Sequence, residues 1–422
     1  DLPAGCLFVA LRGEKFDGHA FVEQAIAAGA VAAVTDRQVG DCPCLVVKDT
    51  GRALQQIARF YREKFHPILV GITGSVGKTT TREMVAAALS AKYKTFKTPA
   101  NHNSQIGVPL TISEISENDE IGVLELGMSE PGEMAVIAEI AAVDSAVMTN
   151  IGVTHIENLG SRENILKEKL HIQDGMKAGG ILFVNGDNDM LSTVHAKAGC
   201  HTVRYGLGAD NDYRAEDLSY LDGFPSFTMV HGEVRVPVKL TVMGEHNVMN
   251  ALAALAVADA YDVPLADAAE KLLEFGGFKN RQQIYHKNGY TIVDDTYNAS
   301  PDSMKAAIGV LSSLPAGRRI AVLADMKELG PETRKFHHEV GVYLGKAPVD
   351  VLVTYGDLAM EIENGAKEQN PALVAVHFQD NEKAAMEQWI QAEEKKGDCI
   401  LFKGSNSMKL GEVAEHVCQR HH

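Results

Sequence analysis

The stretch GITGSVGKTTT, residues 71–81, constrains the fold of this chain more than any other. It follows the apolar run ILV and precedes REMVAAALS, whose apolar spacing predicts a helix. Glycine lets the backbone turn so that successive N–H groups point inward, and a helix N-terminus adds positive potential. A strand, a glycine-rich loop ending in Lys-Thr and a helix together predict a loop that binds the phosphates of a nucleoside triphosphate.

The loop is a variant of the usual Gly-x-x-x-x-Gly-Lys-Ser/Thr pattern, because isoleucine occupies position 72, where the first glycine belongs. We expect Lys78 to reach the β- and γ-phosphates and the Thr79 hydroxyl to ligate Mg²⁺. The alternative, a glycine-rich turn with a surface lysine, fits poorly between a strand and a helix. The predicted ATP-binding residues of the loop are Thr73, Gly74, Ser75, Val76, Gly77, Lys78, Thr79 and Thr80.

Short apolar runs alternate with helical patterns through most of the 422 residues, which predicts an α/β fold with mostly parallel sheets. We expect a small N-terminal α/β domain over residues 1–65, truncated at its start. A central doubly wound P-loop domain follows over residues 66–281. Within it, the period-two pattern of residues 212–242 predicts a small antiparallel insert. Residues 282–422 predict a Rossmann-like C-terminal domain.

The formal charge of −16 argues against a nucleic-acid partner bound through a basic face. No apolar run is long enough to cross a bilayer, so we expect no membrane insertion. The six cysteines are scattered, and we interpret them as reduced thiols of a cytoplasmic protein. We expect a monomer.

Three polar residues follow the central strands and predict chemistry beyond phosphate binding. Glu125 ends the strand IGVLELG, and His155 follows the next strand. In the helical pattern ENILKEKLHIQDGM, Lys169 falls within an apolar stripe, whereas Lys167 falls on the opposite side. Lys169 either extends its ammonium to water along an apolar stem or lies against the sheet. In the second case desolvation favours the neutral amine, which can take up CO₂ to form an anionic carbamate.

With these residues in view, the chain resembles the ATP-dependent Mur ligases of peptidoglycan synthesis. That family has a T-G-x-x-G-K-T loop, a strand-end glutamate, a histidine and a carbamylated lysine fourteen residues beyond it, the spacing of His155 and Lys169 here. The stretch GEHNVMNALAALAVA is also similar to the family's G-x-H-N-x-x-N-A-x-A-A pattern. The resemblance covers all three predicted domains.

The resemblance implies roles for further residues. Asn247 and Asn250 would approach the adenine, Arg281 the ATP phosphates and Asp295 the ribose. Asn280 stands before Arg281 where the family usually has glycine. The resemblance also implies that Thr79, Glu125, His155 and carbamylated Lys169 hold two Mg²⁺ ions, and that Lys78, Glu125, His155 and Lys169 form the catalytic set.

The turn DDTYNASPDSM, residues 294–304, resembles that of the family members that add D-alanyl-D-alanine to UDP-N-acetylmuramoyl-tripeptide. The implied reaction is an ATP-dependent amide ligation through an acyl phosphate. Tyr297 and Asn298 are candidates for binding the dipeptide, with a plain turn as the alternative. Asn101 and Asn103 contact the UDP-sugar or cap the next helix, and the sequence does not decide between these two.

Two other functions stay open on the sequence. One is a Mur or folylpolyglutamate-type ligase that adds a different amino acid, although such enzymes carry a D-x-A-H-x-P turn that DTYNASP lacks. The other is a nucleotide-binding regulatory or scaffold protein without catalysis, which the joint presence of Lys78, Glu125, His155 and Lys169 disfavours.

Overall fold

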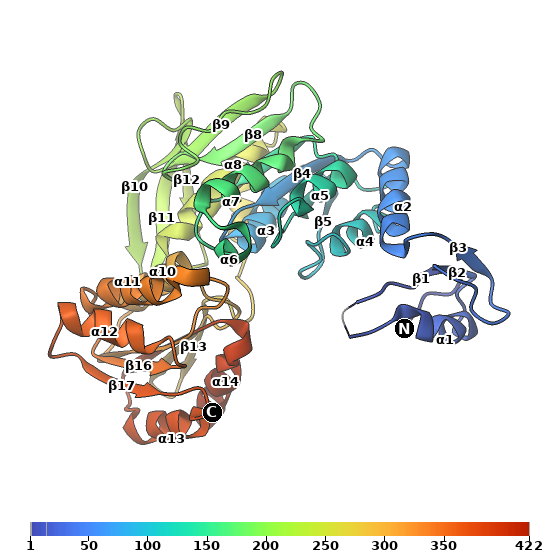
Figure 1. Ribbon diagram of the computed structural model, residues 1–422. Helices are drawn as coiled ribbons and strands as arrows, with labels where there is room; N and C mark the ends of the chain where they lie inside the picture. Colours follow the sequence, from blue (N-terminus) through green and yellow to red (C-terminus); the bar gives the residue numbers. More distant parts are fainter. Residues whose placement is uncertain (1, 14, 422) are drawn as a thin grey trace.

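Three sheets organise the chain in a computed structural model that describes residues 2–13 and 15–421. Within these residues the sheets have three, nine and six strands, in the order of the chain. Figure 1 shows the C-terminal unit directly below the central one, whereas the N-terminal unit lies to one side, joined through a helix. The fold is α/β, as the alternation of apolar runs and helical patterns predicts.

The N-terminal unit is a small parallel sheet ordered β1-β2-β3. Its core is modest, with Ala10, Val22 and Ala33 buried together. The helix α2 then connects this unit to the central sheet. The elements are β1 (Leu7–Val9), η1 (Gly18–Phe21), α1 (Val22–Ala27), β2 (Ala32–Thr35), β3 (Cys44–Val46) and α2 (Thr50–Lys64).

The central sheet is ordered β12-β11-β10-β9-β8-β7-β4-β6-β5. Its strands are β4 (Ile68–Thr73), β5 (Thr95–Lys97), β6 (Ile121–Glu125), β7 (Ser145–Met148), β8 (Ile181–Asn185), β9 (His201–Gly206), β10 (Tyr213–Leu221), β11 (Phe224–His231) and β12 (Val234–Lys239). The predicted antiparallel insert is formed by strands β10 to β12, which extend the main sheet through β9. The period-two alternation predicted that these segments are antiparallel strands. It did not predict that they join the main sheet, because alternation does not specify which sheet edge a hairpin extends.

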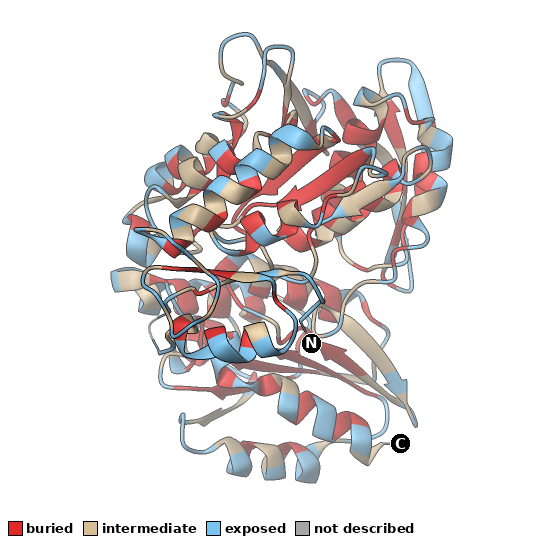
Figure 2. Ribbon diagram, turned by 90° about the vertical axis from the view of Figure 1, so that its right-hand side faces the viewer, coloured by how far each residue is buried: buried red, intermediate tan, exposed pale blue. Residues whose placement is uncertain are grey.

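Helices cover both faces of the central sheet, and Figure 2 shows its strands as mostly buried. The helices α3, α8 and α9 pack on one face, and α2, α4, α5 and α7 pack on the other. These helices and their short neighbours are α3 (Lys78–Leu89), α4 (Gly107–Ser113), α5 (Glu133–Ala141), α6 (Ile156–Leu159), α7 (Arg162–Leu170), η2 (His171–Gln173), α8 (Glu245–Ala260) and α9 (Leu265–Leu272).

Parallel pairing brings the ends of β4, β6 and β7 to one edge of this sheet. Ile72 pairs with Glu125, and Thr73 pairs with Met148. The glycine-rich loop, Glu125 and the segment after β7 therefore emerge side by side, at the carboxyl edge where open α/β sheets bind ligands.

The C-terminal sheet is ordered β13-β14-β18-β15-β16-β17, and only its edge strand β13 pairs antiparallel. Helices α10 to α12 pack on one face, and α13 and α14 on the other. The elements are β13 (Gln283–Lys287), β14 (Tyr290–Asp294), α10 (Pro301–Ser313), β15 (Arg318–Ala324), η3 (Gly330–Glu332), α11 (Thr333–Gly345), β16 (Val351–Tyr355), α12 (Met360–Gln369), β17 (Val374–Phe378), α13 (Lys383–Glu393), β18 (Asp398–Lys403), η4 (Asn406–Met408) and α14 (Leu410–Arg420).

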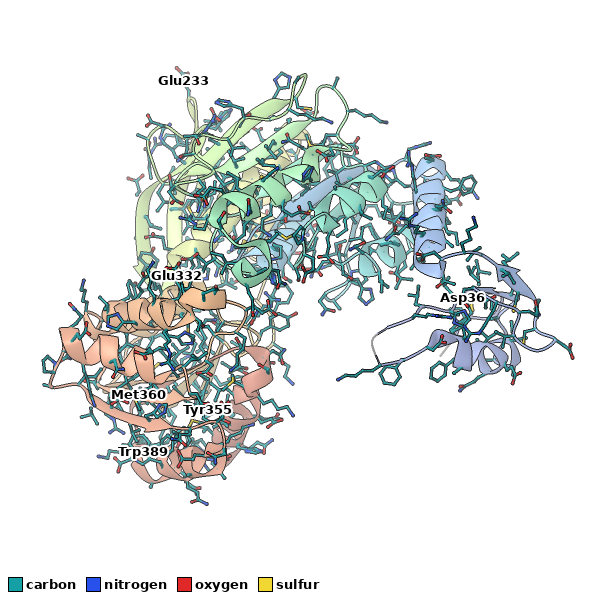
Figure 3. The ribbon with its side chains drawn as sticks, viewed as in Figure 1. Asp36, Glu233, Glu332, Tyr355, Met360 and Trp389 are labelled. Carbon is teal, nitrogen blue, oxygen red and sulfur yellow. The ribbon has the colours of Figure 1, made fainter. Side chains whose placement is uncertain are left out.

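The C-terminal unit docks on the central one where α6 meets η3. Figure 3 places Glu332 at this junction, far from Asp36 of the N-terminal unit. A Cβ on Gly330 would lie 3.2 Å from Glu157 Cα, and one on Gly152 would lie 2.5 Å from the Asp302 carboxylate. The two surfaces therefore approach closely because glycine is present on each side.

Two further sequence expectations concern the whole chain. All six cysteines, which lie within the described residues, are free thiols. Among the described helices, none has the length and apolar composition that crossing a bilayer requires.

Glycines also allow α11 and α12 to pack closely against each other. A Cβ built on Gly341 would lie 2.1 Å from the carbonyl oxygen of Ile362, and one on Gly365 would lie 2.2 Å from that of His338. Backbone atoms cannot move aside as a flexible side chain can, so a larger residue at either position would force the helices apart.

We therefore expect Gly365→Ala to lower the free energy of unfolding of the C-terminal unit by about 1–3 kcal/mol. Gly309→Ala is the matched control, because the nearest atom to a Cβ there is the Tyr343 hydroxyl at 4.0 Å. An alanine at this half-buried helical position should raise stability, by roughly 0.5–1 kcal/mol. The chain's single tryptophan, Trp389, lies in this unit and reports its unfolding in denaturant by fluorescence. Equal midpoints for Gly365→Ala and the wild type would contradict the packing argument.

Candidate active site

The glycine-rich loop has a backbone that only glycine adopts easily at two positions. Gly74 has a φ of 149° and Gly77 one of 87°. A Cβ on Gly74 would lie 1.8 Å from the Thr149 hydroxyl, which leaves no space for any side chain. Steric contact with the segment after β7 thus explains the glycine at position 74, and the positive φ explains the glycine at position 77.

That segment also supports the loop through hydrogen bonds. The Thr149 hydroxyl donates to the Val76 carbonyl (2.6 Å), and the Asn150 side chain accepts from the Val76 N–H (2.8 Å). The Asn150 carbonyl accepts from the Ser75 N–H at 3.0 Å. Sequence reasoning missed both supporting residues, because nothing local marks a partner about 75 positions away. The amides of Ser75 and Val76 are engaged in this support, so the first turn of α3 supplies the free N–H groups.

The loop shows two signs of a phosphate site. The Lys78 ammonium turns back onto its own loop, donating to the carbonyls of Gly74 (2.8 Å) and Ser75 (3.4 Å). Among the described residues, the buried Thr73 hydroxyl has no hydrogen-bond partner, and no side chain caps the start of α3. Burial lowers the pKa of Lys78, while Glu125 nearby opposes the shift and Arg281 adds to it. An anion would satisfy these groups together.

Glu125 is buried and held by three partners. Its carboxylate accepts from Arg82 Nη1 (3.1 Å) and Asn103 Nδ2 (2.8 Å), and its backbone N–H donates to the Thr98 hydroxyl (2.9 Å). Arg82 also donates to the Ala100 carbonyl at 2.8 Å, which ties the loop after β5 to the same carboxylate. The sequence analysis did not single out Arg82, although it is only 3% exposed.

Lys169 is buried at 1% exposure, and Lys167 is exposed, as the helical phase predicts. The α-helix ends earlier than expected, at Leu170, and continues as the short η2, yet Ile165, Ile172 and Met176 remain buried around it. Within the described part of the chain, no hydrogen bond or ion pair engages the Lys169 amine. Burial lowers its pKa well below the usual value, and the nearby Lys78 adds to the shift.

His155 completes this cluster from the segment after β7. Its φ is 65°, a left-handed value that is uncommon outside glycine. Burial lowers its pKa, and the charges of Lys78 and Lys169 lower it further, whereas Glu328 opposes the shift. Lys78 thus lies within electrostatic reach of Glu125, His155 and Lys169, and Lys169 lies within reach of His155. A joint catalytic role for the four residues stays a prediction.

A second group of predicted residues gathers at the linker to the C-terminal unit. The Arg281 guanidinium stacks on the Tyr297 ring at 3.8 Å. Asp295 forms a buried ion pair with Lys403 (2.7 Å), and the same ammonium donates to the Asn298 carbonyl (3.0 Å). Lys403, which the sequence analysis did not single out, therefore joins the predicted ribose and dipeptide residues.

The backbone of the linker accommodates asparagine at position 280, where the family usually has glycine. Asn280 has a φ of 61° and Gln282 one of 52°. Asparagine tolerates this left-handed region better than most residues, so Asn280 replaces the glycine of the family at modest cost. Its carbonyl also accepts from the Tyr297 N–H at 3.0 Å, which fixes the turn that carries Tyr297.

Asn247 and Asn250 lie in a buried chain of hydrogen bonds between α8 and α3. The Asn250 side chain accepts from the Thr81 hydroxyl (2.9 Å) and donates to the Asn247 side chain (3.0 Å). Asn247 in turn donates to the Met243 carbonyl at 2.7 Å. Both amides thus hold α8 against the P-loop helix, and their approach to adenine stays a prediction.

Of the two asparagines after β5, Asn103 contacts Glu125 and Asn101 is exposed. Neither caps the next helix, because the Ser104 hydroxyl accepts from the Gly107 N–H at 3.2 Å. The capping alternative is therefore wrong. A contact of Asn101 or Asn103 with the UDP-sugar stays a prediction.

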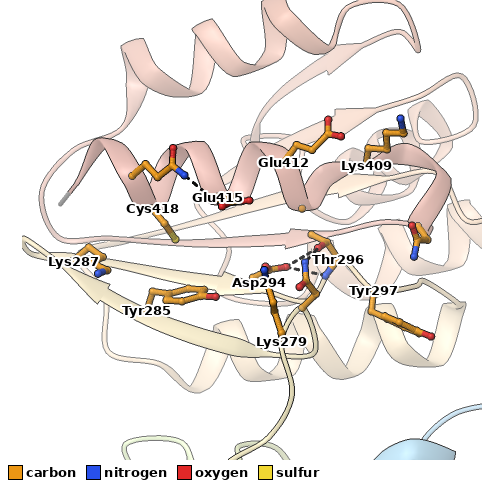
Figure 4. Close-up of a pocket in the computed structure, with 14 residues that line it drawn as sticks. Lys279, Tyr285, Lys287, Asp294, Thr296, Tyr297, Lys409, Glu412, Glu415 and Cys418 are labelled. Atoms are coloured by element: carbon orange, nitrogen blue, oxygen red, sulfur yellow. Dashed lines mark hydrogen bonds between the residues drawn. The ribbon is translucent and has the colours of Figure 1, made fainter. Parts of the chain in front are cut away.

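Two hollows lie beside this second group. One is a groove of about 700 Å³ between α14 and the β13–β14 hairpin, and Figure 4 shows Lys287 at one end and Tyr297 at the other. A smaller pocket of about 350 Å³ lies at the junction of the central and C-terminal units. Tyr297 contributes to both.

The acidic, histidine and cysteine side chains of the described residues form no group of three or more that could hold a metal ion. A site at Glu125 and His155 therefore requires ligands of other kinds. The Thr79 hydroxyl and a carbamate on Lys169 are the further ligands that the sequence predicts. The neutral state that burial favours at Lys169 fits carbamate formation.

A P-loop on a doubly wound sheet, flanked by two further α/β units, defines a nucleotide-binding enzyme of several domains. Family models for the Mur ligase middle domain, the Mur ligase glutamate ligase domain and the Mur ligase family catalytic domain match residues 72–258, 280–406 and 1–62. The chain belongs to the Mur ligase family.

Particular relatives extend this likeness over the whole chain. The chain is 40% identical to the UDP-N-acetylmuramoyl-tripeptide--D-alanyl-D-alanine ligase of Bacillus subtilis, over 98% of this chain and 90% of that protein. It is similar to the crystal structure of MurF from Acinetobacter baumannii, with a TM-score of 0.91 and 31% identity over 99% and 91% of the two chains. The MurF ligase of Thermotoga maritima in complex with ADP gives a TM-score of 0.88 and 30% identity over 99% and 95%.

The burial of Lys169 makes a prediction about stability. Burial lowers the pKa of Lys169, so at neutral pH the amine is protonated in the unfolded chain but not in the folded chain. This difference in bound protons lowers the free energy of unfolding at neutral pH. The loss becomes smaller as the pH rises toward the usual pKa of lysine, where the unfolded chain also loses the proton. We therefore expect Lys169→Met to raise the unfolding midpoint at pH 7 in CO₂-free buffer, with a smaller gain at pH 10. Calorimetry at both values measures this. A midpoint unchanged or lowered at pH 7 would show that the buried ammonium is well solvated.

Proposed function

We propose that this protein is an ATP-dependent ligase that joins D-alanyl-D-alanine to UDP-N-acetylmuramoyl-tripeptide, forming UDP-N-acetylmuramoyl-pentapeptide, ADP and phosphate in peptidoglycan precursor synthesis. The observation that supports the proposal is that Lys78, in the phosphate-binding loop, lies within electrostatic reach of Glu125, His155 and Lys169. Relatives with that named activity share the whole length of the chain. We propose a cytoplasmic monomer.

Each unit has its part in this proposal. Residues 1–65 bind the UDP-sugar, residues 66–281 bind ATP, and residues 282–422 bind the dipeptide and close on the nucleotide. Arg281 contacts the ATP phosphates, Asp295 the ribose, Asn247 and Asn250 the adenine side, and Asn101 or Asn103 the UDP-sugar.

The chemical difficulty is repulsion between anions. A substrate carboxylate must approach the γ-phosphate of ATP, and two unit charges ~4 Å apart repel by ~4 kcal/mol at an effective dielectric near 20. Lys78 lies in the loop to offset this repulsion, and its ammonium is free to exchange its loop carbonyls for phosphate oxygens. The N–H groups at the start of α3 add donors that need no proton transfer.

The donor set fits two Mg²⁺ ions, which when bound neutralise phosphate charge and polarise the reacting oxygens. The Thr79 hydroxyl and Glu125 would hold the ion on the β- and γ-phosphates. His155 and carbamylated Lys169 would hold the second. Arg82 and Asn103 keep the Glu125 carboxylate in a fixed orientation for this role.

Lys169 gains its anionic form by a simple addition. The neutral amine, favoured by burial, attacks the carbon of CO₂, an N–C bond forms and one proton leaves to solvent. Ile165 and Ile172 are buried on the same side of this segment, so the carbamate would lie on the side that faces the protein interior.

Phosphoryl transfer to the tripeptide carboxylate then gives an acyl phosphate, and attack of the dipeptide amine releases phosphate. Water would hydrolyse the acyl phosphate, so the site must be closed before the amine attacks. The contact between α6 and η3 brings the C-terminal unit next to the central one, and closure of this unit on the nucleotide would exclude water.

Phosphate release tests the reaction directly. We expect the full chain with Mg·ATP to release phosphate at an appreciable rate only when both UDP-tripeptide and D-Ala-D-Ala are present. Lys78→Ala should abolish this release, with a loss of at least ~10³-fold, because the charge offset at the γ-phosphate disappears. Equal stimulation by a lone amino acid would favour a relative with another substrate, and no stimulation by any pair would favour a regulatory protein.

The two lysines of α7 provide a matched pair for the carbamate. Lys169→Ala should be nearly inactive and partly restored by formate, which supplies an anionic oxygen in the vacated space. Lys167→Ala should stay close to wild-type activity, because that side chain is exposed. Carbon-13 NMR in ¹³CO₂-enriched buffer gives an independent measure, since a carbamate resonance should be present in the wild type and absent in Lys169→Ala. Loss of activity in Lys167→Ala with none in Lys169→Ala would refute the assignment.

A further inference from the structure

The pocket of about 350 Å³ at the junction of the two larger units has an unusual lining. Thr154 of the central unit forms one side, and residues from three segments of the C-terminal unit form the rest. Its volume is near the lower end of ligand pockets, roughly 300–1,000 Å³, which suits a small ligand. Two neighbouring residues with opposite charge, Lys327 and Glu328, lie on its wall.

Glu328 is held at the side of the pocket that faces the sheet edge. Its carboxylate contacts His155 Nδ1 across the junction at 2.7 Å. Glu328 has a φ of 64° and His155 one of 65°, so both members of the pair adopt the left-handed conformation. Such backbone conformations are uncommon outside glycine and gather at functional sites, where the surrounding structure maintains them.

Lys327 is anchored at its backbone and at its ammonium. Its N–H donates to the Ser405 hydroxyl (2.9 Å), and Nζ donates to the Asp325 carboxylate (2.9 Å). Asp325 is fully buried and accepts from the backbone N–H groups of Leu358 (3.0 Å) and Ala359 (2.7 Å). An ammonium has three donors, so Lys327 keeps N–H groups for a further anion while its position is fixed.

We propose that this pocket binds the incoming dipeptide as a zwitterion, with Glu328 holding its ammonium group and Lys327 its terminal carboxylate. The inference rests on the proposed function, since it names the subsite of the second substrate. A fixed anion beside a fixed cation is the complement of a molecule that carries one charge of each sign. Ser405 and Ser407 also line the pocket and add polar groups to its wall.

The orientation follows from the place of each charge. Glu328 contacts His155, and His155 lies in the cluster where the acyl phosphate would form. A dipeptide bound in this direction points its nucleophilic nitrogen toward the electrophile and its carboxylate away from the anionic phosphates. The reverse direction would place the carboxylate beside Glu328 and near the γ-phosphate, where like charges repel.

The decisive variant is Glu328→Gln, which keeps the shape of the side chain and removes its charge. A hydrogen bond to a charged group is lost, so we expect affinity for D-Ala-D-Ala to fall at least tenfold, with KM for ATP and for UDP-tripeptide unchanged. Glu368→Gln is the matched control. Its carboxylate also pairs with a histidine, His338 (3.0 Å), and is 58% exposed, as Glu328 is, but it lies outside the pocket. That variant should keep all three constants.

Dipeptide analogues separate a contact with the substrate from a structural role. The wild type should bind N-acetyl-D-Ala-D-Ala more weakly than D-Ala-D-Ala, and Glu328→Gln should bind the two almost equally. Lys327→Met should bind D-Ala-D-Ala and D-Ala-D-alaninamide almost equally, while it still binds N-acetyl-D-Ala-D-Ala more weakly than D-Ala-D-Ala. Retained discrimination in both variants, or a fall in kcat with dipeptide affinity unchanged, would overturn the inference.

Calorimetric titration of the full chain with the dipeptide, in the presence of a non-hydrolysable ATP analogue and UDP-tripeptide, measures binding without turnover. Binding that depends on Glu328 without amide formation would refute the proposed function and leave the pocket assignment intact. Amide formation that is insensitive to Glu328 would refute the pocket assignment alone.

Discussion

Removal of basic side chains from water at the carboxyl edge of the central sheet is the constraint on which the site depends. Lys78, Arg82 and Lys169 come from two helices on opposite faces of the sheet; Arg82 and Lys169 are buried, and Lys78 is partly buried. Glu125 partly balances them. Burial also lowers the pKa of Lys78, and a bound polyanion at this edge would stabilise its charged ammonium. A nucleoside triphosphate is such a polyanion, and its binding would return part of the free energy that burial costs.

The same physics explains which residues the sequence could identify. Lys169 was found because a charged residue interrupts an apolar stripe at helical spacing. Arg82 obeys that rule too, since it lies in phase with Val85 and Leu89 on α3, and the same test applied to that helix would have found it. The helical periodicity of apolar residues therefore identifies a buried charged side chain wherever the helix is long enough for its buried face to be recognised.

Features that arise from contacts between distant segments could not be found in this way. Asn150 supports the P-loop from another strand, and Lys403 reaches Asp295 from more than a hundred positions away. Glu328 is exposed and lies in a loop, so no pattern distinguishes it from other surface glutamates. The short strands β3 and β13 were missed because three to five residues at a sheet edge carry too little alternation.

The junction between the central and C-terminal units gives these separate features a common setting. Gly152 and Gly330 allow the surfaces to meet, and the pair of His155 and Glu328 spans them. Because the small pocket takes Thr154 from one unit and its charged residues from the other, its outline depends on how the two units are docked. A rotation of the C-terminal unit away from the central one would separate Thr154 from Lys327 and Glu328 and would break the contact between His155 and Glu328. The relative orientation of the two units therefore controls both the shape of this pocket and the surroundings of His155.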